Sequence, residues 1–159
     1  VSLERELAMV SDYLALEHVR FEDRIHIEQD VADETLPLQV PPLLLQTLVE
    51  NAVKYGIGTR PSGGFIHVVS RIEDGAHHLR VVNSGKICNR DGASTGLGLK
   101  NTRDRLQLIF GASASLRLFE GVPDTVTAEV VIPLRKPAES AASEAPPSAL
   151  QRSNKPAFA

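Results

Sequence analysis

A nearly continuous apolar helix between residues 42 and 55 constrains this chain more than any other feature. Pro41 and Pro42 suit the start of a helix, and Gly56 and Gly58 suit its end. The apolar residues between them are Leu43, Leu44, Leu45, Leu48, Val49, Ala52 and Val53. Because a helix that is apolar nearly all round is a buried helix, we expect this one to lie inside the domain.

Four polar residues interrupt this helix at regular spacing. Thr47, Glu50, Asn51 and Lys54 recur at i, i+3, i+4 and i+7, which places them on one face. A buried strip of amide, carboxylate and ammonium groups is costly unless something polar meets it, so we expect the strip to line a pocket. The alternative is a surface helix whose polar face meets water, which is the commoner arrangement for an arbitrary helix.

The rest of the chain alternates helices with strands. Ser2 predicts the cap of an amphipathic helix to about Val19, with Glu4 and Glu6 in a solvated first turn. Strands are expected at residues 24–31, 65–71, 79–83, 116–120 and 126–132, and a short helix from residue 99 to Gly111. This order predicts an α+β fold, a two-layer α/β sandwich in which helices pack on one face of a mixed sheet.

Composition narrows the class of function. The chain has 17 basic and 20 acidic residues of mixed order and a formal charge of -3, which argues against a nucleic acid partner. One cysteine, Cys88, cannot form an internal disulfide, which fits the reducing cytoplasm. No apolar run approaches the roughly 20 residues of a membrane-spanning helix, so this segment is not expected in a membrane.

The two ends of the chain carry different expectations. It begins at Val1 rather than at a methionine, which suggests an upstream part that would carry any membrane anchor. Residues 137–159 are rich in Ala, Ser, Pro and Glu with few large apolar groups. Ordering them would cost entropy with little burial in return, so we expect a disordered tail.

Two further motifs follow the polar strip. Asn83-Ser84-Gly85 ends a predicted strand, where an amide can donate and accept in one plane and small residues admit a flat ligand. Gly96-Leu97-Gly98-Leu99 opens a predicted helix and exposes backbone N–H groups to an anion. Either motif alone is also typical of ordinary strand-ending turns and helix starts.

Taken in order, the three sites resemble the N box and the two glycine boxes of the GHKL ATP-binding superfamily. The chain is more closely similar to the LytS-type sensor histidine kinases over about residues 1–134. The segments that carry this likeness are residues 13–17 with Arg20-Phe21, residues 41–54 and residues 96–106. The resemblance implies a Bergerat-type GHKL catalytic domain at residues 23–136, preceded at residues 1–22 by the end of a phosphoacceptor or dimerisation helix, or by a linker.

The resemblance also implies an activity and its partners. The implied protein is a MgATP-dependent protein-histidine kinase whose phosphoacceptor lies elsewhere, because the Asn-Pro-His-Phe motif does not occur in this sequence. The implied partners are ATP, the phosphoacceptor helices of the same parent chain or of its dimer mate, and a LytTR-type response regulator. The parent would be anchored in the bacterial inner membrane with this domain in the cytoplasm.

Residue roles follow from the same resemblance. Asn51 would hold Mg²⁺ and, with Lys54, serve catalysis, while Tyr55 would flank the nucleotide. Asn83 stands where the superfamily usually has an aspartate for the adenine amino group, and its amide oxygen can accept that bond without charge assistance. The other implied nucleotide-binding residues are Thr47, Glu50, Gly85, Gly96, Leu97, Gly98 and Leu99, with residues 86–95 as a short lid.

The residue at position 47 distinguishes ATP hydrolysis from phosphate transfer to histidine. Hydrolytic superfamily members such as gyrase carry a glutamate general base there, whereas the hydroxyl of Thr47 is a poor base, so hydrolysis is disfavoured. Two alternatives stay open beside the kinase: a catalytically silent ATP-binding pseudokinase or interaction module, which Asn83 would suit, and a GHKL hydrolase. The five histidines, His18, His26, His67, His77 and His78, are expected on solvent-facing surfaces and outside any phosphoacceptor box.

Overall fold

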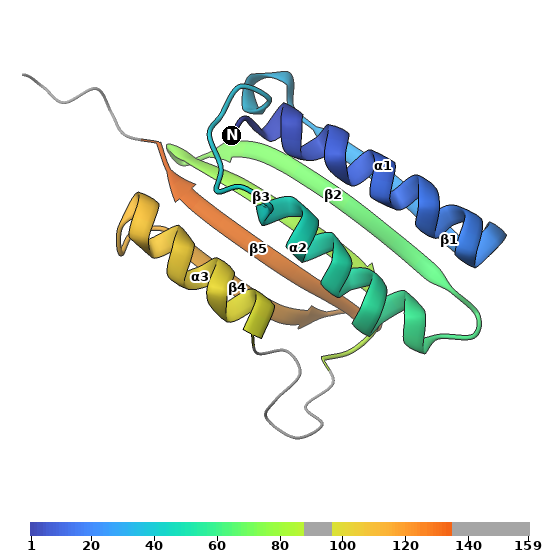
Figure 1. Ribbon diagram of the computed structural model, residues 1–159. Helices are drawn as coiled ribbons and strands as arrows, with labels where there is room; N and C mark the ends of the chain where they lie inside the picture. Colours follow the sequence, from blue (N-terminus) through green and yellow to red (C-terminus); the bar gives the residue numbers. More distant parts are fainter. Residues whose placement is uncertain (88–96, 135–159) are drawn as a thin grey trace, which may run out of the picture.

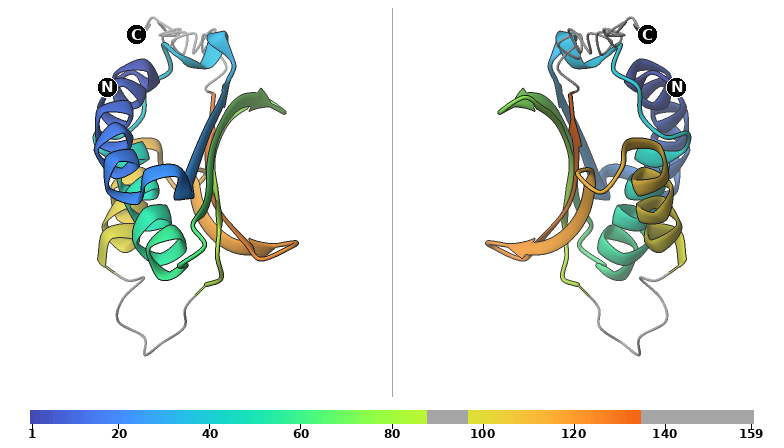
Figure 2. Two further views of the ribbon diagram at one scale, coloured as in Figure 1. Left: turned by 90° about the vertical axis from the view of Figure 1, so that its right-hand side faces the viewer. Right: turned by 90° about the vertical axis from the view of Figure 1, so that its left-hand side faces the viewer.

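The computed structural model describes residues 1–87 and 97–134, which form two layers (Figure 1). The helices are α1 (Leu3–Phe21), α2 (Leu44–Asn51) and α3 (Leu97–Phe110). The strands are β1 (Ile25–Val31), β2 (Gly64–Glu73), β3 (Ala76–Ser84), β4 (Ser115–Gly121) and β5 (Thr125–Pro133). Figure 2 shows the three helices together on one face of the sheet. The predicted two-layer α+β sandwich is confirmed.

The sheet is mixed, with the strand order β1-β2-β3-β5-β4. Strand β1 runs parallel to β2, and the other neighbours pair antiparallel. The β2–β3 and β4–β5 pairs are hairpins, whereas β3 and β5 are separated in the chain by α3 and β4. The β2–β3 turn contains Asp74 and Gly75 at φ 50° and 74°, a conformation that glycine adopts without steric cost. The strands expected at residues 65–71 and 79–83 are therefore joined as a hairpin across this turn.

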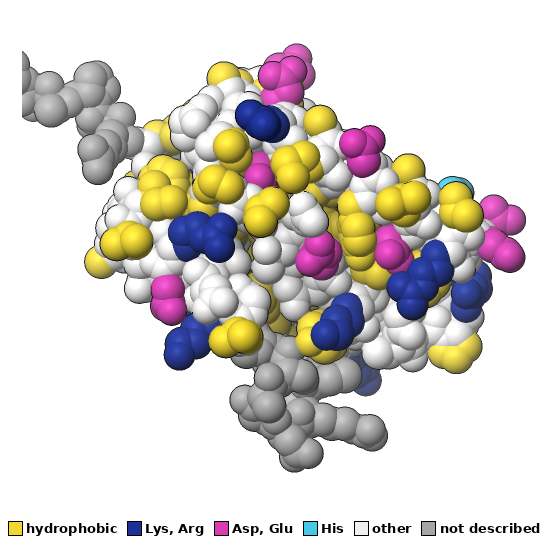
Figure 3. Space-filling view, in the orientation of Figure 1, with side chains coloured by type: hydrophobic (Ala, Val, Ile, Leu, Met, Phe, Trp, Pro, Cys, Tyr) yellow, Lys and Arg dark blue, Asp and Glu magenta, His cyan; other side chains and the backbone are white. Residues whose placement is uncertain are grey.

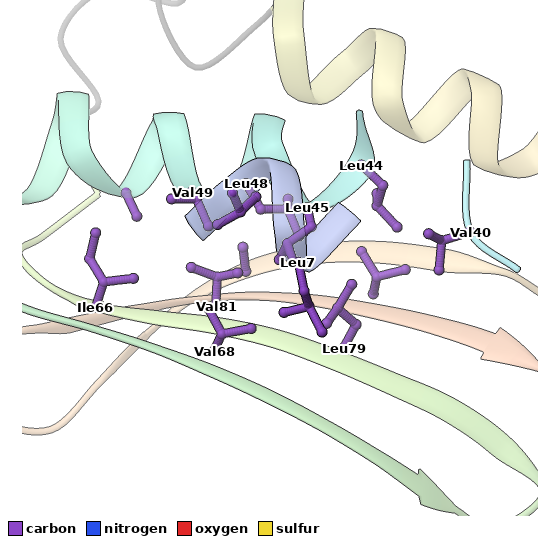
Figure 4. Packing of buried hydrophobic residues seen from close by; sticks show 14 of the residues in the cluster. Leu7, Val40, Leu44, Leu45, Leu48, Val49, Ile66, Val68, Leu79 and Val81 are labelled. Atoms are coloured by element: carbon purple, nitrogen blue, oxygen red, sulfur yellow. The ribbon is translucent and has the colours of Figure 1, made fainter. Parts of the chain in front are cut away.

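The core lies between α1, α2 and the inner face of the sheet (Figure 4). Leu45, Leu48 and Val49 of α2 are at most 1% exposed, and they meet strand residues such as Val68 and Val81. Full burial of one such side chain contributes about 1.5–3 kcal/mol, so this layer fixes how α2 sits on the sheet. Helix α1 adds Leu3, Leu7, Val10 and Leu14 to the same core.

The helix that carries the polar strip changes its winding. The α-helix ends at Asn51, a π-helical segment η3 runs from Ala52 to Gly56, and a 3-10 segment η4 follows from Ile57 to Thr59. The sequence pattern predicted that Gly56 and Gly58 end the helix. Instead, Gly56 lies in the π-helical segment and Gly58 in the 3-10 segment that continue it. Single π turns within helices are frequent at functional sites, and this one begins directly after Asn51.

The first and last helices follow the prediction more closely. The Ser2 hydroxyl accepts the N–H of Arg5 at 3.4 Å, so the predicted cap of α1 is confirmed. Helix α3 begins at Leu97, two residues earlier than expected, and ends before Gly111, which has φ 81°. The short 3-10 segments η1 (Glu22–Arg24) and η2 (Asp33–Thr35) flank β1.

Glu6 does not lie on a solvated face, and that prediction is wrong. Its side chain is 1% exposed, and its two carboxylate oxygens accept the backbone N–H groups of Leu43 at 2.7 Å and Leu45 at 3.0 Å. These amides belong to the start of α2, where Leu43 has φ 62° and no side-chain cap of its own. A carboxylate from α1 therefore caps the first turn of α2.

His77 is also buried rather than solvent-facing, which corrects a second prediction. It lies on the core side of β3 and is 1% exposed, and its Nε2 is 2.8 Å from Ser70 Oγ. The Ser70 hydroxyl in turn donates to Thr35 Oγ1 at 2.8 Å. Burial and, secondarily, the charge of His78 lower the pKa of His77 to about 4.

The face of the sheet away from the helices carries an ion-pair network. Arg80 Nε donates to Glu129 at 2.8 Å, Arg117 donates to the same carboxylate at 2.6 Å, and Arg80 also pairs with Glu73 at 2.8 Å. Burial would raise the pKa of Glu129, but the hydrogen bonds from Arg80 and Arg117 outweigh it and lower that pKa. On the opposite, helical face, basic and acidic side chains are interspersed (Figure 3).

Some predictions fall outside the described residues, namely those for Cys88, Gly96, residues 88–95 of the expected lid and residues 137–159. Across residues 1–87 and 97–134, no helix combines the length and the hydrophobicity that crossing a membrane requires.

Candidate functional site

The four residues of the polar strip line one open groove. Thr47 and Asn51 are half-buried, whereas Glu50 and Lys54 are exposed. The opposite wall of the groove is the start of α3, formed by Leu97 and Gly98. The sequence pattern suggested that the polar strip is buried, and that prediction is wrong. The strip stays partly exposed because α3 approaches α2 without covering the strip. It forms the polar side of a groove between two helices.

A second cavity adjoins this groove, and both Asn51 and Asn83 line it. Asn51 and Tyr55 line both hollows, so the polar groove and the cavity are continuous. The remaining lining of the cavity is mostly apolar: Leu48, Ala52, Gly56, Lys86, Ile87, Leu99, Leu118, Val126 and Ala128. An apolar cavity with a few convergent polar groups is the usual form of a small-molecule site.

The side chain of Asn51 is held by its own helix. Its Nδ2 donates to the Thr47 carbonyl at 2.7 Å, and the Thr47 hydroxyl donates to the Leu43 carbonyl at 2.7 Å. Within the described part of the chain, no group donates a hydrogen bond to Asn51 Oδ1. The amide oxygen is therefore available to a ligand or to a hard cation, which prefers oxygen donors.

Asn83 forms the other polar end of the cavity. It is 6% exposed, and its Nδ2 donates to the Ser84 carbonyl at 3.0 Å. Its Oδ1 accepts no hydrogen bond from residues 1–87 or 97–134. Because the nitrogen is committed to Ser84, the oxygen is the atom of this amide that a bound molecule can use.

Close approach at this end of the site depends on glycines. A Cβ on Gly56 would lie 2.2 Å from Asn83 Nδ2 and 2.7 Å from the Ser84 carbonyl oxygen. Gly85, at φ 144°, lies against Gly56 and donates its N–H to the Asp124 carbonyl at 2.8 Å. Side chains at either position would separate η3 from the end of β3 and alter the cavity.

Gly98 brings α3 close to the polar strip, because a Cβ there would lie 3.7 Å from Thr47 Cγ2 and 3.9 Å from Asn51 Nδ2. The two leucines of the same motif diverge. Leu99 is buried and lines the cavity, whereas Leu97 is 74% exposed at the groove. Gly96, the fourth residue of the predicted motif, lies outside the described residues.

Lys54 and Glu50 occupy the exposed rim of the groove. The Lys54 ammonium lies over the Tyr55 ring, 5.0 Å from its centroid, in a cation–π contact. Glu50 Oε1 accepts a hydrogen bond from Gln46 at 2.7 Å. Burial, followed by the nearby carboxylates of Glu17 and Glu50, raises the pKa of Tyr13 to about 12. Glu50 therefore acts electrostatically toward α1 as well as toward the groove.

Three residues that line the cavity were not predicted from the sequence: Leu118, Val126 and Ala128 of β4 and β5. Lys86 and Ile87, which belong to the predicted lid at residues 86–95, follow β3 and line the cavity as well. Ile87 is held by its N–H, which donates to Glu120 at 2.6 Å. These strand residues carried only an ordinary period-2 signal, so no motif could have distinguished them from the rest of the core.

Comparison with known proteins shows which structures share this fold. No protein-family model matches the chain. Among solved structures, the catalytic domain of the histidine kinase ThkA has a TM-score of 0.65 at 20% identity, covering 84% of this chain and 94% of that one. The histidine kinase domain of the Erythrobacter litoralis blue-light activated histidine kinase has a TM-score of 0.62 at 20% identity, covering 84% and 62%. The fold is therefore that of histidine kinase catalytic domains.

A curated relative is similar in sequence over most of this chain. The sensor histidine kinase/phosphatase LytS of Staphylococcus aureus is 34% identical over 153 residues, which cover 87% of this chain and 26% of LytS. The chain thus spans about a quarter of the length of the curated relatives it matches. Over this stretch the chain is similar to the LytS-type sensor histidine kinases, and the resemblance found in its motifs is confirmed.

Proposed function

We propose that this chain is the MgATP-binding catalytic domain of a two-component sensor histidine kinase, which transfers the γ-phosphate of ATP to a histidine outside residues 1–159. The observation that carries the proposal is the continuous hollow between Asn51 and Asn83, with a free amide oxygen at each end. The apolar part suits a purine ring, and the polar groove suits phosphates.

The adenine would lie in the cavity with its amino group toward Asn83 Oδ1. Gly56 and Gly85 leave room for the base, and Leu99 and Ile87 cover it from the other side. The phosphates would lie in the groove beside Lys54 and the start of α3, where the N–H groups of a helix N-terminus favour an anion.

Asn51 would contribute an oxygen to Mg²⁺, which neutralises phosphate charge when bound. The residues fit that role because Asn51 Nδ2 is tied to Thr47, which leaves Oδ1 as the free donor atom. Lys54 would add positive charge at the groove rim. In the transfer, an imidazole nitrogen forms a bond to the γ-phosphorus, the bond to the β–γ bridging oxygen breaks, and ADP leaves.

Thr47 makes transfer to histidine a better assignment than hydrolysis. Its hydroxyl donates to the Leu43 carbonyl at 2.7 Å, and a threonine hydroxyl is in any case a poor base for activating water. A neutral imidazole is already a nucleophile, so position and charge neutralisation are most of what the protein must supply.

The partners and the location of the longer protein belong to the same proposal. The phosphoacceptor would come from helices joined to this domain at residues 1–22 or from a dimer mate, and residues 23–136 would form the catalytic domain. The phosphate would pass to a response regulator, for which we propose the LytTR type. ThkA has been crystallised with its response regulator TrrA. We further propose that the parent protein is anchored in the bacterial inner membrane, with this domain in the cytoplasm.

Nucleotide binding by the chain itself is the direct test. A fluorescent ATP analogue titrated with and without Mg²⁺ should show saturable binding that the metal strengthens. Asn51→Ala should remove most of the metal-dependent gain, while a substitution on the far face of the sheet, Val69→Thr, should not. Binding that is absent, or indifferent to both Mg²⁺ and Asn51, would rule the proposal out.

A further inference from the structure

Glu6 is joined to Asn51 by a continuous series of hydrogen bonds. The Glu6 carboxylate accepts the Leu43 N–H at 2.7 Å. The Leu43 carbonyl accepts both the Thr47 hydroxyl at 2.7 Å and the Thr47 N–H at 3.1 Å. The Thr47 carbonyl accepts Asn51 Nδ2 at 2.7 Å. One side chain of α1 is therefore connected to the amide that the proposed function assigns to Mg²⁺.

Each bond in this series restricts the next. Leu43 has φ 62°, which a leucine adopts only under constraint, and the Glu6 carboxylate provides that constraint from both sides through Leu43 and Leu45. The Leu43 carbonyl then has a fixed direction, which fixes the rotamer of Thr47. A chain of hydrogen bonds of this kind polarises along its length, so its end responds to its beginning.

Helix α1 is tied to the same segment by backbone bonds. Leu3 N–H donates to the Leu38 carbonyl at 2.9 Å, Glu4 N–H donates to the Leu36 carbonyl at 3.0 Å, and Val40 N–H donates to the Val1 carbonyl at 2.9 Å. The start of α1 and the chain that leads into α2 therefore move as one piece, and Glu6 carries their position into the first turn of α2.

We propose that Glu6 is a positioning residue of the nucleotide site: it caps α2 and, through Leu43 and Thr47, sets the orientation of the Asn51 amide. The α1 helix thereby influences nucleotide affinity from the side of the domain opposite the adenine cavity. This inference rests on the proposed function, because it needs a nucleotide that contacts Asn51.

The unmodified chain offers a test that does not depend on folding of a variant. Coupling between two sites is reciprocal, so a nucleotide bound at Asn51 must alter the Glu6 end of the series. In a two-dimensional NMR titration with MgATP, the amide signals of Leu43 and Leu45 should shift with the same midpoint as the Asn51 side-chain amide. Stationary Leu43 and Leu45 signals in a saturated protein would overturn the inference.

Glu6→Gln provides the second test, because it keeps the shape but replaces one acceptor oxygen by a donor that faces a backbone N–H. We expect MgATP affinity to fall at least about fivefold, equivalent to about 1 kcal/mol, at a temperature where the variant is fully folded. Leu116→Ala is the matched control, since Leu116 is buried in β4 beneath α3 and its loss destabilises the domain away from α2.

The outcomes are distinguishable. A destabilised Leu116→Ala that keeps its affinity, beside a Glu6→Gln that loses it, supports the positioning role. Equal affinities in Glu6→Gln and in the unmodified chain show that Glu6 only stabilises the fold. If the unmodified chain does not bind MgATP, the proposed function itself fails.

Discussion

In the proposed nucleotide site, Asn83 would bind the adenine amino group with a neutral side chain, where the superfamily usually has an aspartate. Its Nδ2 is committed to the Ser84 carbonyl at 3.0 Å, so the amide cannot turn over without leaving two oxygens in contact. The bond to Ser84 therefore sets the orientation of the amide, whose oxygen would be the acceptor for a bound base. An aspartate would offer the same acceptor with a stronger bond, but it would repel the Ser84 carbonyl.

This fixed amide predicts base discrimination. ATP presents an amino group to Asn83 Oδ1, whereas inosine triphosphate presents an oxygen. We expect inosine triphosphate to bind about tenfold more weakly or worse, since a lost hydrogen bond and an unpaired acceptor together are worth at least about 1.4 kcal/mol. Competition titrations measure this ratio, and Asn83→Leu should bring it close to one. Equal affinities in the unmodified chain would mean that the amide turns freely.

Gly56 is the residue whose size matters most at the adenine end. In Gly56→Ala the new methyl group would lie 2.7 Å from the Ser84 backbone oxygen and still closer to the Asn83 side chain. We expect destabilisation of about 1–3 kcal/mol by overpacking, together with loss of nucleotide affinity. Chemical denaturation and titration measure the two effects. Gly98→Ala is the control for stability, because its methyl group would meet Thr47 and Asn51 at ordinary van der Waals distances of 3.7 and 3.9 Å.

At the scale of elements, hydrophobic periodicity was sufficient to predict the helices and strands of the two layers. It was not sufficient to predict the contacts between the elements. The alternation of β2 and β3 and the apolar face of α2 predicted where each strand and helix lies. Local pattern could not show that Glu6 meets the start of α2, because the two are 37 residues apart along the chain. His77 was missed for a related reason: its partner is Ser70 on β2, which in turn donates to Thr35 in η2, so only tertiary pairing makes its burial possible.

The His77 network predicts how stability depends on pH. The pKa of His77 falls from 6.5 to about 4 on folding, so the unfolded chain binds this proton more readily. The stabilisation is complete above pH 6.5 and is lost as the pH falls toward 4, by up to about 3 kcal/mol. Urea unfolding at several pH values should show this slope, and His77→Gln should flatten it between pH 6.5 and 5.

The control for this prediction separates His77 from the acidic groups. Arg80 donates to both Glu73 and Glu129, and these bonds lower the pKa of each carboxyl, so their contribution is lost at lower pH than that of His77. A slope that survives in His77→Gln would assign it to another group.

At the scale of the whole molecule, the site joins parts that are far apart in the chain. Asn51 is the last residue of α2, Asn83 lies near the end of β3, Leu99 belongs to α3, and Val126 comes from β5. A nucleotide that contacts all of them would bind the folded chain and not the unfolded one. Binding should therefore stabilise the whole domain rather than one element, because the elements share a single core.

Thermal unfolding measures this effect directly. At an ATP concentration about a hundred times the dissociation constant and with Mg²⁺ present, the gain is about 2.7 kcal/mol. For a domain of this size that raises the midpoint by roughly 10 °C. Asn51→Ala should keep the midpoint of the free protein within a few degrees, since its amide bonds only to the Thr47 carbonyl at the groove, and should lose most of the shift. A midpoint that rises equally with ATP and Mg²⁺ in both proteins would show that the nucleotide binds without Asn51.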